Sequence, residues 1–190
     1  MKKFTEPVND QKLEPADPGG TELIDAGPVT FGVEYRFFYQ RDAEGELTDE
    51  VNDHGLSIHV YEGSSGLTAP EHLRFDCLLM RPHYHYINWA EQRQEHVWYD
   101  PASSGDMVEW SLDRLRNRLV PMLIEAGATQ LINEIDPREV EAALSKVAGW
   151  ADALRERAQR NWRGSIYLTG AGVWPHWHPA DAPGQYAQHG

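Results

Sequence analysis

The chain has 190 residues, 41% of them hydrophobic and 25% charged, which is typical of one soluble globular domain with a real core. Its net charge is −13, and residues 31–105 alone contain five arginines, no lysine and thirteen acidic residues. Such a surface repels phosphate backbones, so we expect no nucleic-acid partner.

No apolar run is long enough to cross a membrane, and the start MKKFTEPVND has no apolar stretch behind its two lysines. The sequence therefore predicts no membrane contact and no secretory signal, and we expect a cytoplasmic protein. The single cysteine, Cys77, excludes an internal disulfide framework and a cysteine-rich zinc site.

Residues 1–30 are polar, rich in Pro and Gly between Pro15 and Gly27, and without a hydrophobic period. They cannot form a core of their own, so we expect an extended arm that lies on its own domain or on a neighbouring subunit. The second alternative predicts a homo-oligomer or a partner subunit, with a C2 dimer as the default form.

Five runs rich in β-branched and aromatic residues follow, separated by turn signals such as RDAEGE, EGSSG and RP. Because the connections between consecutive runs are short, we expect a five-stranded antiparallel meander. The runs cover residues 31–40, 56–63, 72–80, 83–88 and 95–100.

Two amphipathic helices are predicted after the strands. The first begins at the cap residue Asp106 and ends at Gly127, and Pro121 should bend its last turn. The second begins at the cap residue Asp136 and ends at Gly164.

The fold class is therefore α+β, with the meander sheet covered on one face by the two helices. We expect a single domain over residues 31–164, between the N-terminal arm of residues 1–30 and a C-terminal arm of residues 165–190. The C-terminal arm is rich in Trp, His and Pro.

The stretch RPHYHYINW, residues 81–89, indicates where to look for a site. Alternation along a strand puts His83 and His85 on one face and Tyr84 and Tyr86 on the other. If Arg81 and Pro82 form a tight turn, His83 pairs with Met80 and His85 with Leu78, and the tyrosines face the helices.

The same alternation brings further titratable side chains to the face away from the helices. His96 and Trp98 join this face if Val97 and Tyr99 point into the core. The other members expected there are His59, Asp76, Arg36 and Arg74. Convergent titratable groups on a half-apolar surface are what a small-molecule site requires.

Two chemistries fit these residue types. His83 and His85 could ligate one divalent ion, Zn, Fe, Mn or Ni, with His59 or the carboxylate of Asp76 as the third ligand. Alternatively, Asp76 beside a histidine could perform acid–base chemistry while Arg36 or Arg74 binds a substrate carboxylate. In either case we expect the histidines to be exposed and to contribute more to function than to folding.

The C-terminal arm carries a second alternating pair, His176 and His178, between tryptophans and prolines. We interpret it as a docking arm, with metal binding as the second interpretation. The functional hypothesis is a small-molecule enzyme on the polar sheet face, with a divalent metal in one version. The alternative is a non-catalytic accessory subunit held by its terminal arms.

Overall fold

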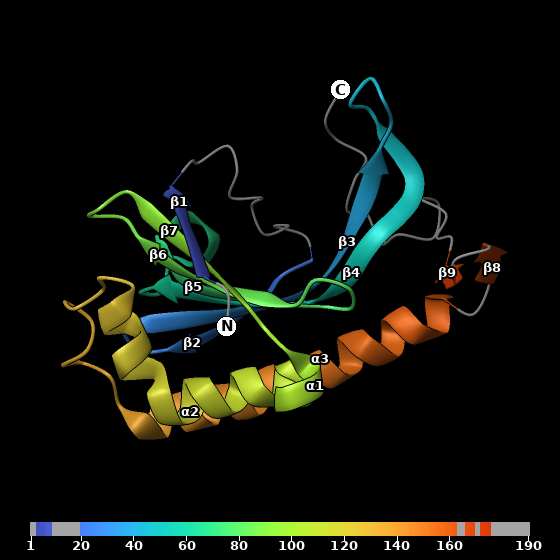
Figure 1. The fold of residues 1–190 in the computed structure, drawn as a ribbon. Coiled ribbons are helices and arrows are strands. Elements are labelled where there is room, and N and C mark those ends of the chain that lie inside the picture. The colour runs from blue at the N-terminus through green and yellow to red at the C-terminus, as the bar shows by residue number, and fades with distance from the viewer. Residues whose placement is uncertain (1–2, 9–19, 163–165, 170–171, 176–190) are drawn as a thin grey trace.

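The computed structural model describes residues 3–8, 20–162, 166–169 and 172–175. The C-terminal pair His176 and His178 lies outside these residues. Figure 1 shows a curved sheet with its helices packed on one side. The strands of the main sheet are β1 (Lys3–Pro7), β2 (Glu22–Ala26), β3 (Val29–Arg41), β4 (Leu47–Glu62), β5 (Glu71–Leu78), β6 (His83–Asn88) and β7 (Arg93–Trp98).

The helices are α1 (Pro101–Ser104), α2 (Met107–Glu125) and α3 (Pro137–Trp162), with a short 3₁₀ turn η1 (Gly66–Thr68) between β4 and β5. The α+β class and the large antiparallel sheet are confirmed. A separate two-stranded pair, β8 (Ile166–Thr169) and β9 (Gly172–Pro175), follows α3. In the described residues, no helix is long and apolar enough to span a membrane.

The predicted number of five strands is wrong, because the main sheet has seven, in the order β1-β7-β6-β5-β4-β3-β2. The two additional strands come from residues 1–30 and form opposite edges of the sheet. Neither edge strand is fully apolar: β1 is largely exposed, and β2 buries only Ile24 and Ala26. An edge strand needs little burial, so its sequence carries a weak signal.

The helix starts follow the predicted caps. The Asp106 carboxylate accepts hydrogen bonds from the amides of Val108 and Glu109, and Asp136 accepts one from the amide of Arg138. Both helices pack against the sheet face that carries Phe31, Ile58, Leu73, Phe75 and Val97. The opposite face is therefore left for polar side chains.

The predicted pairing between β5 and β6 is wrong. His83 pairs with Asp76 rather than Met80, and His85 pairs with Arg74 rather than Leu78. The turn is wider than Arg81 and Pro82, and within it Asp53 accepts hydrogen bonds from the backbone amides of Met80 and Arg81. The register moves by four residues, an even number, so the paired side chains of both strands keep their predicted faces. Leu79, which was expected in the core, lies after the end of β5 and is exposed.

Candidate functional site: a histidine cluster on the polar sheet face

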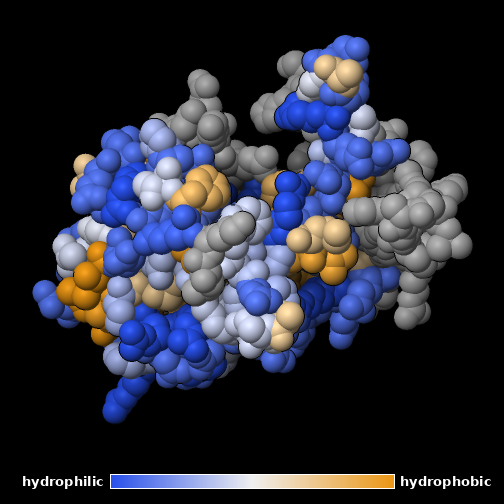
Figure 2. All heavy atoms as spheres, viewed as in Figure 1, coloured by the Kyte–Doolittle hydropathy of each residue, from blue (hydrophilic) through white to orange (hydrophobic). Residues whose placement is uncertain are grey.

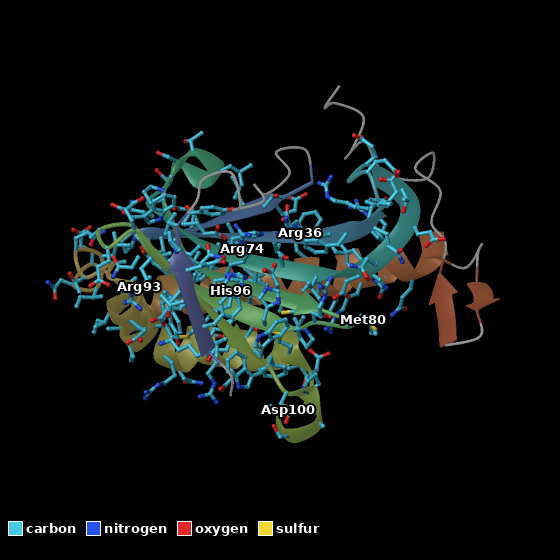
Figure 3. All side chains as sticks on the ribbon, turned by 45° about the horizontal axis from the view of Figure 1, so that its top comes forward. Arg36, Arg74, Met80, Arg93, His96 and Asp100 are labelled. Carbon is cyan, nitrogen blue, oxygen red and sulfur yellow. The ribbon has the colours of Figure 1, made fainter. Side chains whose placement is uncertain are left out.

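The sheet face away from α2 and α3, called the polar face below, carries the predicted site residues. Figure 3 shows Arg36, Arg74 and His96 along this face, with the helices behind the sheet. Figure 2 looks at the sheet from its edge, and in this view the surface is mostly hydrophilic, with several apolar patches. Two groups of side chains occupy the polar face, and Asp76 links them.

The first group is a buried ion-pair network. The His59 ring lies between two carboxylates: its Nδ1 atom is 2.5 Å from a Glu71 oxygen, and its Nε2 atom is 3.2 Å from a Glu34 oxygen. Arg74 binds both oxygens of Glu71, at 2.9 and 2.5 Å. The network consists of Glu34, Arg36, His59, Glu71, Arg74 and Asp76.

This network is largely closed to solvent, since His59 is 0% exposed and Arg74 is 5% exposed. Burial alone would raise the pKa of Glu71, but the Arg74 guanidinium and His59 hold it at about 2. Burial would likewise lower the pKa of His59, and the carboxylates of Glu71 and Glu34 raise it instead. The Glu71 carboxylate therefore stays ionised inside the protein.

The second group is the histidine cluster, defined as His83, His85 and His96. Each of these residues offers one ring nitrogen, and the three nitrogens lie within 4.8 Å of one another. His83 and His85 come from β6, while His96 lies directly opposite His85 on β7. The ring centroids of His85 and His96 are 4.1 Å apart. Three imidazoles gathered in this way are a group that could hold one metal ion.

The hydrogen bonds of the cluster leave ring nitrogens available as ligands. His83 Nδ1 lies 2.7 Å from the carbonyl oxygen of Arg81 and donates to it, and its Nε2 atom lies 3.5 Å from Asp76 Oδ2. His85 Nε2 lies 3.0 Å from Asp76 Oδ2 and donates to that carboxylate. The Nδ1 atom of His85 is buried and has no hydrogen-bond partner among the described residues.

The charge state of the cluster also suits a metal. Burial lowers the pKa of His85 to about 4, which outweighs the opposite effect of the Asp76 hydrogen bond. Burial lowers the pKa of His96 as well. The Asp76 carboxyl keeps its pKa well below the usual range: burial acts against this, and the hydrogen bond from His85 and the charge of Arg74 outweigh it. Neutral imidazoles beside an ionised carboxylate are the ligand states that a cation requires.

The structure separates residues that the sequence grouped together. His59 lies in the ion-pair network with both ring nitrogens on carboxylates, whereas His96 lies with His83 and His85. Arg36 and Arg74 are paired with acidic residues of the same network. The expectation that both histidines of β6 are exposed is wrong for His85, which is 4% exposed beneath its neighbours.

Three acidic residues of the site were not among the predicted site residues: Glu34, Glu71 and Glu6. Glu34 shares its face with Arg36 by simple alternation, which was visible in the sequence. Glu71 is the first residue of β5 and falls one position before the predicted strand. Glu6 lies on β1, whose position beside β7 has no sequence signal.

Fold and site together define an α+β protein with a buried ion-pair network and a histidine cluster on one face of a seven-stranded sheet. The chain belongs to the family described as a domain of unknown function, DUF7700, whose model matches residues 23–151. Comparisons with curated proteins and with solved structures found no match.

Proposed function

We propose that the protein is a small-molecule enzyme whose site is the polar sheet face, with one divalent metal ion held by His83, His85 and His96. The observation that carries this proposal is the Nδ1 atom of His85, a buried ring nitrogen that has no partner among the described residues and belongs to a cluster of three imidazoles. A buried polar atom without a partner is destabilising unless something binds it. A cation would supply that partner.

The surroundings of the histidines support the same proposal. Protein histidines that bind metals usually donate their second ring N–H to a carboxylate or a backbone carbonyl. His85 does so to Asp76, and His83 does so to Arg81. Three nitrogen donors favour Zn²⁺, with Fe, Mn and Ni as the other ions of matching chemistry.

Three protein ligands would leave the ion a free coordination position, where it could polarise a substrate oxygen or lower the pKa of water. Asp76 would fix the tautomer and orientation of His85 through the Nε2 hydrogen bond. Arg36 lies 3.8 Å from Asp76 Oδ1 and would hold that carboxylate ionised. The ion-pair network would thus serve as a rigid support, and the reaction class we favour is metal-assisted hydrolysis or hydration of a small molecule.

The test is metal analysis of untagged full-length protein together with a titration by Co²⁺, whose absorption spectrum reports nitrogen ligation. We expect one ion per chain, and we expect His85→Ala and His96→Ala to abolish high-affinity uptake. His54→Gln is the matched control, since His54 lies on β4 in register with Phe37 and its Nδ1 atom contacts the Tyr35 hydroxyl.

Activity assays then distinguish the two functional hypotheses, an enzyme and a non-catalytic accessory subunit. The loaded wild type should hydrolyse activated ester or phosphoester probes faster than the His85→Ala protein. Protein that takes up no stoichiometric ion, or that loads equally well after His85→Ala, contradicts the metal site. Loaded protein that turns over none of the probes favours the accessory subunit.

A further inference from the structure

The strand β1 brings two side chains against the histidine cluster. Antiparallel pairing with β7 sets Phe4 opposite His96 and Glu6 opposite Gln94. The Phe4 ring stacks on the His96 ring, with centroids 4.5 Å apart and an interplanar angle of 20°. Two side chains contact His96 Nε2: Glu6 Oε1 at 3.0 Å and the amide nitrogen of Gln94 at 2.7 Å.

These contacts fix the third histidine of the cluster. When His96 donates its Nε2–H to the Glu6 carboxylate, its Nδ1 lone pair is left for a ligand, in the same way that the Nε2 bond to Asp76 leaves the Nδ1 atom of His85. The stacked Phe4 ring restricts rotation of the imidazole. The strand β1 therefore acts on both the tautomer and the orientation of His96.

The strand is attached by contacts that do not involve the histidines. Lys3 forms ion pairs with Glu95 and with Glu125 of α2, on the helix side of the sheet. The amide of Val8 donates to the carbonyl of Gln92 at 2.9 Å. These contacts hold β1 on the sheet independently of the histidines. The strand precedes residues 23–151, which match the family model.

We infer that Glu6, supported by Phe4, is a positioning residue for the metal site, so that ion binding and docking of β1 stabilise each other. This inference rests on the proposed metal site. The family-matched domain supplies the three candidate ligands, and the strand that precedes it supplies the groups that hold one of them. By thermodynamic linkage, the factor by which docked β1 strengthens ion binding equals the factor by which the ion strengthens docking.

The experiment compares four full-length proteins: wild type, Glu6→Ala, Glu6→Gln and Thr5→Ala. Thr5 is the matched control, because it lies on β1 between Phe4 and Glu6 and so points to the other side of the strand. For each protein, Zn²⁺ affinity is measured by competition with a chelator, and the Co²⁺ spectrum is recorded. Hydrogen exchange of the β1 amides is followed with and without Zn²⁺.

We expect Glu6→Ala to weaken Zn²⁺ binding by about 10- to 100-fold and to alter the Co²⁺ spectrum. Glu6→Gln keeps an acceptor oxygen and should recover part of the loss, while Thr5→Ala should match the wild type. Zn²⁺ should slow exchange in β1 of the wild type and slow it less in Glu6→Ala.

Two results would overturn the inference, and they are distinguishable. If wild type and Glu6→Ala bind Zn²⁺ equally well, and the ion leaves β1 exchange unchanged, the metal site stands and the coupling to β1 is wrong. If the wild type binds no ion at all, the proposed function fails and the coupling fails with it. An equal loss of affinity in Thr5→Ala would show that β1 acts only as a structural edge, which also overturns the role of Glu6.

Discussion

His85 lies at the centre of the polar face, because its Nε2 atom is 3.0 Å from Asp76 on one side and its ring is 4.1 Å from the His96 ring on the other. The Asp76 carboxylate also belongs to the ion-pair network through Arg36. His85 therefore joins the network to the histidine cluster, and His83 Nε2 also approaches Asp76 Oδ2, at 3.5 Å. We therefore expect a substitution of Asp76 to alter metal binding by the histidine cluster, although Asp76 is not one of the three ligands.

We expect Asp76→Asn to weaken metal binding by about 10- to 100-fold, the range typical for loss of a carboxylate that orients a ligand histidine. The amide side chain of asparagine lacks the negative charge that interacts with His85, Arg74 and Arg36. Chelator competition with Zn²⁺ measures the effect. Asp113→Asn is the control, since the half-exposed side chain of Asp113 lies on α2 and accepts a hydrogen bond from Asn117. Equal affinity in Asp76→Asn and wild type would show that Asp76 has no part in the site.

A second prediction separates the core from the site. Phe75 is fully buried between Tyr84 and Trp110, so Phe75→Ala should lower the free energy of unfolding by about 3–5 kcal/mol. His83 is partly exposed and its ring bonds a backbone carbonyl, so His83→Ala should cost about 1 kcal/mol or less. Urea unfolding of metal-free protein gives both values. Equal losses would make His83 a structural residue.

Alternation within strands predicted the polar face well. It placed His83, His85, Asp76 and Arg74 together, and it survived a wrong register because the error was an even number of residues. The same rule put His96 on this face, since Val97 is in the core. Alternation does not give the distance between side chains that lie on different strands of the same face. His59 was therefore grouped with His83 and His85, although it is not part of the histidine cluster.

The two edge strands show which parts of the sheet local sequence patterns do not predict. β2 has a short alternation, with Ile24 and Ala26 buried, which was available in the sequence. β1 has none, because its partner β7 lies about ninety residues away and its burial is slight. Contacts such as Glu6 with His96 depend on long-range pairing, which local periodicity does not encode.

A third prediction concerns self-association. In the described sheet, β1 and β2 each pair on one side only, and they expose Phe4 and Leu23 at 45% and 44%. Edge strands of this kind are natural templates for pairing with another chain. We expect light scattering at micromolar concentration to give the mass of a dimer, and Leu23→Lys to shift it toward the monomer if β2 is the edge used. A monomeric mass for the wild type would contradict this prediction.

The last prediction is the pH dependence of stability in metal-free protein. His59 has a raised pKa in the folded state because Glu71 and Glu34 outweigh its burial, so the folded protein holds this proton more tightly than the unfolded chain does. The resulting stabilisation is fully present below the unfolded pKa of about 6.5 and is lost as the pH rises through the folded value, at most about 1.4 kcal/mol per pH unit. Urea unfolding at several pH values above neutrality should show this decline in the wild type and a flatter profile in His59→Gln.

His54→Gln is the control of opposite sign, since burial lowers the pKa of His54. Removing His54 should therefore leave the loss of stability at alkaline pH unchanged. A titration of the His59 ring by NMR checks the same proton without any substitution, and a folded pKa below 6.5 would show that burial, not the two carboxylates, controls this histidine.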